Sequence, residues 1–166
     1  MTSKQIQELA KQISSMLSES NNQYKETEAL LYNYTGYKET IVRNKQRIDN
    51  IIQNGAEEKA KSNKGEYVQG GIKEYGGLPE EEIRQIDHIL EENSKLEKRV
   101  IRIENALIHI EDDEYQEIIA LRYFKNKSIE EIATHLDVNE KTIARNRTRI
   151  INKLQTILFS EIIIGY

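Results

Sequence analysis

The stretch that decides the fold is SIEEIATHLDVNEKTIARNRTRIINKL, residues 128–154. Apolar residues recur at helical spacing on both sides of DVN (137–139), which predicts two amphipathic helices joined by a short turn. Ser128 and Glu131 have the spacing of a capping box at the start of the first helix. Asn139 can cap the second helix, and the small Ala133 allows the two helices to cross closely. These features predict a helix-turn-helix.

The second helix has an apolar face and a polar face. Its expected buried stripe contains Ile143, Ile150, Leu154, Ile157 and Leu158. The opposite face, at about 100° per residue, holds Lys141, Arg145, Thr148, Arg149 and Asn152. Arginine and lysine can pair with guanine edges and asparagine with adenine, so this face is suited to reading DNA in the major groove. Residues 140–155 carry five cations and one anion, a local charge of +4 in a chain of net charge −4.

A longer stretch carries a family resemblance. YQEIIALRYFKNKSIEEIATHLDVNEKTIARNRTRIINKL (115–154) resembles region 4 of bacterial sigma factors. TEALLYNYTGYKETIVRNKQRIDNII (27–52) and the heptad helix after it resemble phage-encoded regulators of the ArpU and RinA type, which activate late genes. The resemblance implies a transcription regulator that binds double-stranded DNA in the cytoplasm of a bacterial host, with RNA polymerase as a further partner. It also implies early recognition-helix contacts by Glu140, Lys141 and Arg145, with Ala144 beside them.

Two features depart from the sigma pattern. Asn146 occupies a position where sigma factors usually have an apolar residue, so the middle of the second helix is expected to pack differently. We also find no segment like the promoter-melting region, so we do not expect a complete sigma factor. Arg147 lies near the buried stripe, and we expect its head group to reach Glu130 or Glu131.

The rest of the chain is organised by heptads. Residues 1–21 form an expected N-terminal amphipathic helix, and SESNNQ (18–23) interrupts its pattern. Residues 22–112 contain two heptad helices separated by a glycine-rich segment, 54–78, which we expect to be a flexible loop. Residues 113–166 form the expected DNA-binding domain. The predicted fold class is therefore all-α: a long antiparallel, coiled-coil-like helical hairpin followed by a C-terminal helix-turn-helix domain.

One polar residue in each heptad stripe sets the register of the expected hairpin. If residue numbers that sum to 137 face each other, Asn44 meets Asn93, Ile48 meets Ile89, and Ile41 meets Leu96. Two facing asparagines can exchange hydrogen bonds, whereas either one facing an apolar side chain would leave its amide unsatisfied. The alternative is a parallel homodimer in which Asn93 meets Asn93 of a second chain.

Catalytic and metal chemistry find little support in the sequence. There is no cysteine, the three histidines are scattered, and no nucleophile–base pair is visible. We expect no enzyme, no cofactor, no metal site and no membrane association. Two other classes remain open: a DNA-packaging subunit of the phage small-terminase type, which would assemble as a large ring, and a protein-interaction module that uses the acidic hairpin. Oligomer mass and DNA affinity at low salt would distinguish them.

Overall fold

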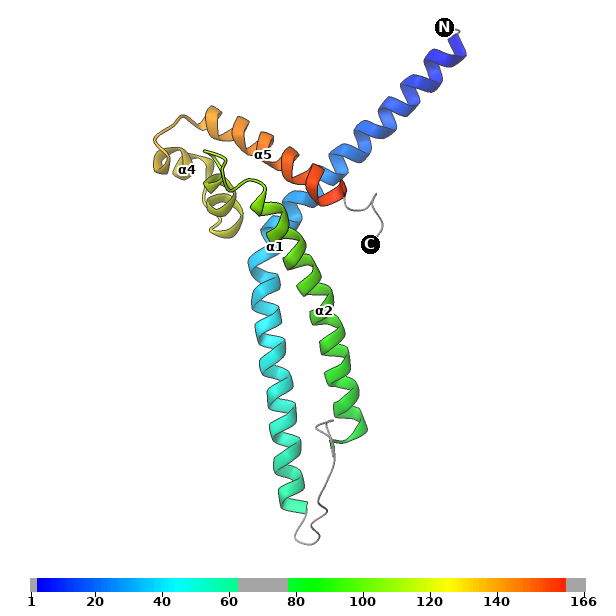
Figure 1. Ribbon diagram of the computed structural model, residues 1–166, viewed down its shortest axis with the longest axis vertical. Coiled ribbons are helices and arrows are strands. Elements are labelled where there is room, and N and C mark those ends of the chain that lie inside the picture. Colours follow the sequence, from blue (N-terminus) through cyan, green and yellow to red (C-terminus); the bar gives the residue numbers. More distant parts are fainter. Residues whose placement is uncertain (1–2, 63–77, 161–166) are drawn as a thin grey trace. The chain divides into compact units, whose positions relative to one another are not determined.

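The computed structural model describes residues 3–62 and 78–160 (Figure 1). The helical segments are α1 (Ser3–Ser62), α2 (Glu80–Ile108), α3 (Glu117–Ile119), the π-helix η1 (Ala120–Phe124), α4 (Ile129–His135) and α5 (Glu140–Ser160). Within these described residues no strand is found, so the all-α prediction is confirmed. None of the described helices is both long and apolar enough to cross a membrane.

The chain divides into two compact units that we describe separately. One comprises Gly36–Val100, and the other comprises Met1–Thr35 together with Ile101–Tyr166. We call them the hairpin unit and the C-terminal unit. The long helices α1 and α2 contribute to both.

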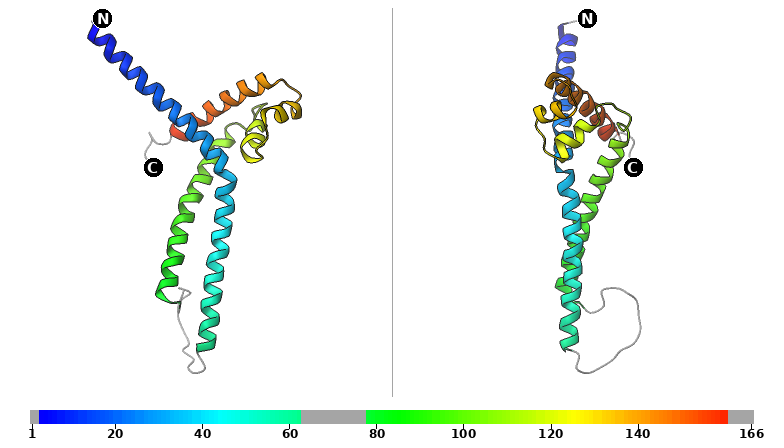
Figure 2. Two further views of the ribbon diagram at one scale, coloured as in Figure 1. Left: turned by 180° about the vertical axis from the view of Figure 1, so that it is seen from behind. Right: turned by 90° about the vertical axis from the view of Figure 1, so that its left-hand side faces the viewer.

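The hairpin unit consists of two antiparallel helical segments. Within it, α2 runs beside α1 in the opposite direction in each of the views (Figures 1 and 2). Ile48, Ile86 and Ile89 form its buried core, with Ile51 and Leu78 packed against them. Burying branched aliphatic side chains along one seam supplies the main driving force for pairing two helices that are otherwise polar.

The register of the hairpin is the predicted one. Asn44 Nδ2 donates a hydrogen bond to Asn93 Oδ1 at 2.9 Å. On the flank of the seam, Lys45 and Glu97 form an ion pair at 3.2 Å. The buried Asn93 amide nitrogen has no hydrogen-bond partner of its own. The pair therefore fixes the register while leaving one buried donor unsatisfied, which limits what it adds to stability.

Two expectations about α1 are wrong. The helix continues without interruption through residues 18–23, where a break after the N-terminal helix was expected. Those residues include neither proline nor glycine, the two residues that most disfavour a helix interior. The predicted loop is also helical as far as Ser62, and residues 63–77 lie outside the described part of the chain.

Gly55 is part of this helical extension, and its lack of a side chain has a packing reason. A Cβ atom there would collide with the Leu78 side chain and press on Glu82. The glycine therefore leaves room for the Leu78 and Glu82 side chains against the backbone of α1.

The C-terminal unit is held together by aromatic side chains. The Tyr123 hydroxyl donates to Glu28 Oε1 at 2.6 Å, and its ring meets Tyr32 edge-on at a centroid distance of 4.6 Å. Burial and the neighbouring Glu28 carboxylate raise the pKa of Tyr123 well above its ordinary value, so its proton is retained for this bond. The Tyr34 hydroxyl donates to Glu104 Oε1 at 2.7 Å, and its ring lies against Phe124. Tyr123 and Phe124 thus attach the segment before α4 to α1, and Tyr34 joins α1 to α2 within the unit.

Candidate DNA-binding surface

The predicted capping box at the start of α4 is present. Ser128 Oγ accepts from the Glu131 backbone N–H at 3.1 Å, and Glu131 Oε2 accepts from the Ser128 N–H at 2.8 Å. Glu131 also accepts from Lys127 Nζ at 2.7 Å. The Lys127 bond, followed by the Ser128 N–H, lowers the pKa of Glu131 to about 2. These interactions fix the residue at which α4 begins.

The turn between α4 and α5 has a defined backbone. Asp137 adopts a positive φ of 51°, in the left-handed region that asparagine and aspartate tolerate better than most side chains. Two residues later, Asn139 Oδ1 accepts from the Thr142 backbone N–H at 2.8 Å and from the Thr142 hydroxyl at 3.1 Å. The predicted asparagine cap of α5 is therefore confirmed, and it sets the direction in which α5 leaves the turn.

A small apolar core locks α4 against α5. Ile132 and Ile143 are fully buried, and Ala133 between them is 6% exposed. The alanine brings the two helices close at their crossing, as expected from its size. The other buried members are Ile118 and Leu121, and four partly buried side chains pack against the cluster: Tyr115, Ile129, Leu136 and Val138. This packing fixes the position of α5 relative to α4. A helix that presents side chains to a partner needs such a fixed position.

The two faces of α5 are largely as predicted. Every residue of the candidate set is exposed: Glu140, Lys141, Ala144, Arg145, Thr148, Arg149 and Asn152. The expected stripe is buried except for Ile157, which is half-buried. Three further residues are buried that the sequence pattern did not assign to the stripe: Asn146, Ile151 and Gln155.

Arg149 faces solvent but is engaged within the protein. Its two terminal nitrogens donate to the two carboxylate oxygens of Asp113 at 2.7 and 2.8 Å. The Asp113 side chain is only 11% exposed, and its Oδ1 also accepts from the Tyr115 N–H at 3.0 Å. The expected role of Arg149 in contacting bases conflicts with this position, because a bidentate pair would have to be broken or shared. In the structure Arg149 holds α5 against the segment before α3, and its contact with DNA stays a prediction.

Asn146 explains how α5 packs at its middle. Its Nδ2 donates to the Thr142 carbonyl oxygen at 3.0 Å, and its Oδ1 accepts from Arg149 Nε at 3.1 Å. The buried amide is therefore satisfied on both sides, and it continues the Arg149–Asp113 contact into the domain. As expected, this position does not pack as an apolar residue would. Asn146 forms a polar network there instead.

Arg147 is half-buried, as its position near the buried stripe suggested, but its neighbours differ from those expected. Glu131 is bound by Lys127 and the Ser128 N–H. The positive charge of Arg147 instead acts on Tyr123, lowering the pKa of that phenol against the dominant effect of burial. Its buried Nε has no hydrogen-bond partner. Arg147 thus belongs to the interior side of α5.

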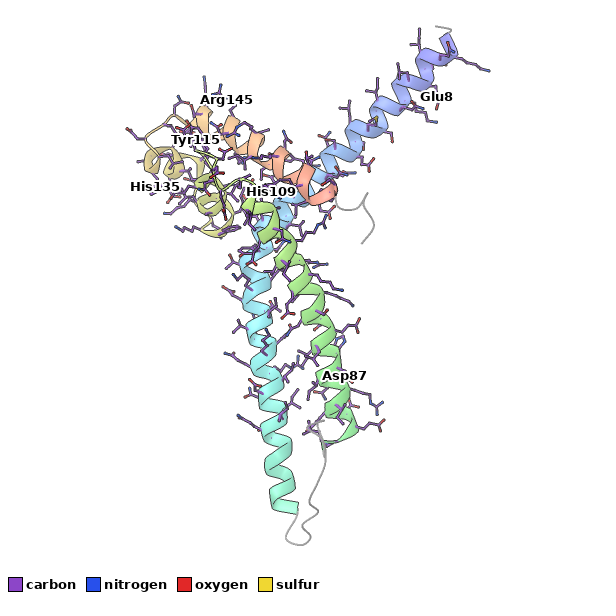
Figure 3. All side chains as sticks on the ribbon, viewed as in Figure 1. Glu8, Asp87, His109, Tyr115, His135 and Arg145 are labelled. Carbon is purple, nitrogen blue, oxygen red and sulfur yellow. The ribbon has the colours of Figure 1, made fainter. Side chains whose placement is uncertain are left out.

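On the exposed face of α5, several side chains are not engaged by other charged groups among the described residues and could bind a ligand. Lys141 and Arg145 are exposed and form no ion pair within the described residues; Arg145 is labelled on α5 in Figure 3. The Thr148 hydroxyl donates to the Ala144 carbonyl oxygen at 3.1 Å, which leaves its oxygen as an acceptor. Lys141, Ala144, Arg145 and Thr148 lie three or four residues apart, so they share one face of the first half of α5.

Two of the histidines, His135 and His88, each lie beside a glutamate and not in a group of metal ligands among the described residues. His135 Nε2 lies 3.1 Å from Glu117 Oε1, and His88 Nε2 lies 3.7 Å from Glu92 Oε1. Across residues 3–62 and 78–160, no three histidine, cysteine or carboxylate side chains are grouped in a way that could hold a metal ion.

Comparison with known proteins adds one match. Residues 112–154 match the family model for Sigma-70, region 4. No curated protein and no solved structure matches the chain. The matched range begins one residue before Asp113 and ends at Leu154 in α5, so it contains the capped α4, the turn and the exposed face described above. The C-terminal helix-turn-helix is therefore similar to region 4 of sigma-70, which indicates a DNA-binding function connected with transcription.

Proposed function

We propose that this chain is a sequence-specific DNA-binding transcription regulator, an activator of late genes in a phage or prophage, working in the bacterial cytoplasm without enzymatic activity. The observation that carries the proposal is the rigidly capped helix-turn-helix, similar to Sigma-70 region 4, that presents Lys141 and Arg145 on the exposed face of α5. In this proposal the first half of α5 enters the major groove of double-stranded DNA.

The charges on α5 suggest that the binding is modest. Arg149 is paired with Asp113 and Arg147 is half-buried, so the exposed cations of α5 outside an ion pair within the described residues are Lys141, Arg145 and Lys153. With about three phosphates neutralised, the logarithm of the binding constant should fall with the logarithm of salt concentration at a slope of about −3. The net charge of −4 on the whole chain adds a general repulsion from DNA. A second protein contact would then be needed for firm promoter occupancy, and RNA polymerase is the partner that the sigma-like domain favours.

The test is a selection of bound fragments from bacterial and phage genomic DNA. We expect the wild-type chain to enrich a small set of promoter-proximal fragments, and the Lys141→Ala/Arg145→Ala variant to enrich none. The matched control is Arg43→Ala/Lys98→Ala, which removes the same two charges from exposed positions of the hairpin unit. Fragment enrichment that survives in the α5 variant, or that is lost equally in the control, would contradict the proposed surface.

Activation is tested separately with purified bacterial RNA polymerase. Transcription from an enriched fragment should rise when the wild-type chain is added and stay at its basal level with the Lys141→Ala/Arg145→Ala variant. A fall in transcription with the wild-type chain would indicate a repressor and refute the activator assignment, while leaving DNA recognition in place.

A further inference from the structure

The N-terminal part of α1 carries an apolar stripe that the protein itself does not cover. Ile6, Leu9, Ile13 and Met16, which we call the N-terminal stripe, are 55%, 47%, 49% and 70% exposed. Leu17 beside them is 61% exposed. Within the described part of the C-terminal unit, no other helix lies beside this stretch, which Figure 3 marks with Glu8. Contiguous exposed aliphatic side chains on one helix face mark an interaction surface.

The N-terminal stripe continues the seam that is buried further along the same helix. Ile6 and Ile13 lie whole heptads before Ile41 and Ile48, and Leu9 and Met16 lie whole heptads before Asn44. In the hairpin unit Asn44 and Ile48 face α2. Within the C-terminal unit, Ser20 and Gln23 occupy the same heptad positions, and Gln155 Nε2 donates to Ser20 Oγ at 3.4 Å and to Gln23 Oε1 at 3.3 Å. Positions of the heptad seam therefore contact Gln155 from Ser20 onward, whereas the apolar positions before Ser20 are exposed.

We propose that the N-terminal stripe pairs with the same stripe of a second copy of this chain, as a parallel two-stranded coiled coil over residues 3–19. Ile6 and Ile13 occupy the first core position of the heptad, and Leu9 and Met16 the second. A β-branched residue at the first position with an unbranched one such as leucine at the second favours two parallel strands.

The flanks of the stripe and the state of the helix support the same partner. From residue 10 to residue 19, the positions beside the core hold Ala10, Gln12, Leu17 and Glu19, so two parallel copies meet almost no like-charge repulsion. The segment is the beginning of a helix that extends to Ser62, so its helical turns are already nucleated before pairing. A seam of two heptads is short, and the dimer should therefore dissociate on dilution.

Dimerisation through the N-terminal stripe would also set the symmetry of the DNA site, an inference that rests on the proposed function. A parallel coiled coil of identical chains has a twofold axis, so the two α5 helices would be related by twofold symmetry. The DNA site should then contain two half-sites in inverted orientation. Doubling the number of exposed α5 cations would also offset the modest charge that one copy brings to DNA.

Sedimentation of the full chain in the absence of DNA tests the proposal independently of DNA binding. We expect wild type to show a dimer that dissociates on dilution, and Ile6→Glu/Ile13→Glu to be a monomer at every concentration. The control is Gln7→Glu/Ser14→Glu, which adds the same two charges to exposed positions one residue along the helix and should dimerise like wild type. All four substituted side chains are exposed in the single chain, and unchanged helical content and melting would confirm that folding is intact. A monomeric wild type, a larger oligomer, or a dimer that survives Ile6→Glu/Ile13→Glu would overturn the proposal.

Orientation and the identity of the occupant are tested with two further variants. The chain has no cysteine, so Leu9→Cys should form a disulfide between two chains under mild oxidation if the helices are parallel and in register. Failure of the Leu9→Cys dimer to crosslink would reject the parallel arrangement. A chain ending at Ser160 removes residues 161–166, which include three consecutive isoleucines. If only this shortened chain dimerises, the stripe is occupied by the chain's own C-terminal residues, and the proposal is refuted.

Discussion

The ion pair between Asp113 and Arg149 should contribute measurably to the stability of the helix-turn-helix, and Asp113→Asn isolates that contribution. The substitution keeps an oxygen that can accept from the Tyr115 N–H, but it removes the charge that both terminal nitrogens of Arg149 contact at 2.7 and 2.8 Å. It leaves the volume of the side chain unchanged. The variant therefore loses a charge-assisted, bidentate contact, and its amide NH2 group would face the Arg149 Nη1 donor in place of an acceptor.

The magnitude follows from the pKa of Asp113. Hydrogen bonding to Arg149 lowers this pKa from 3.8 to about 2. At about 1.4 kcal/mol per pH unit the full shift corresponds to roughly 2.4 kcal/mol. Arg149 is 49% exposed, so solvent screening reduces the expected loss in unfolding free energy to about 1–2 kcal/mol. Because the folded-state pKa is the lower one, the contribution is complete well above 3.8 and is lost as the pH falls towards about 2.

Urea unfolding of wild type and Asp113→Asn across this acid range measures the effect. The unfolding free energies should differ at neutral pH and converge as Asp113 of the wild type is protonated. Asp112→Asn, at the exposed neighbouring carboxylate, serves as the control and should match wild type at every pH. Equal stabilities at neutral pH, or a difference that does not shrink on acidification, would refute the structural role assigned to this pair.

Three further experiments test other parts of the fold. Asn93→Leu should lower the unfolding free energy by about 1–3 kcal/mol, because it leaves the Asn44 amide against an apolar side chain. Asn44→Leu/Asn93→Leu should recover that loss when both variants are compared by thermal unfolding. Asp137→Val should cost about 1–2 kcal/mol because the position has a φ of 51°, whereas Asp137→Gly should be at least as stable as wild type; a tolerated valine would show that the turn is built differently. Ile41→Cys/Leu96→Cys should close a disulfide within one chain on mild oxidation, and products linked only between chains would reject the hairpin register.

Features set by local chemistry could be predicted from the sequence. Ser128 and Glu131 lie three residues apart and cap each other, so their roles depend on a single turn of chain. Asn44 and Asn93 are far apart in the sequence. Their pairing can still be predicted, because each is the polar position in an apolar heptad stripe and the two stripes can be aligned on it. Both features follow from periodicity, which a sequence displays directly.

Features that depend on a partner distant in the chain could not be predicted in this way. Gln155 is buried because it meets Ser20 and Gln23, more than 130 residues earlier. Asp113 lies in the acidic run EDDE (111–114), which its composition alone assigns to solvent, and only the position of Arg149 on α5 shows that it is a structural anchor. In each case a polar side chain is satisfied by a remote partner, whereas sequence patterns assign polar residues to solvent.

The measurement that tests the central claim most directly is a titration of an enriched duplex and a scrambled duplex with wild type, Arg145→Ala and Arg43→Ala. If Arg145 contacts a base edge, Arg145→Ala should weaken binding to the enriched duplex by roughly 1–3 kcal/mol and reduce discrimination between the two duplexes. Arg43→Ala, which removes an exposed arginine from the hairpin unit, should leave both affinities unchanged. Wild-type binding that does not distinguish the duplexes, or an Arg145→Ala variant that binds both as wild type does, would contradict sequence recognition by the exposed face of α5.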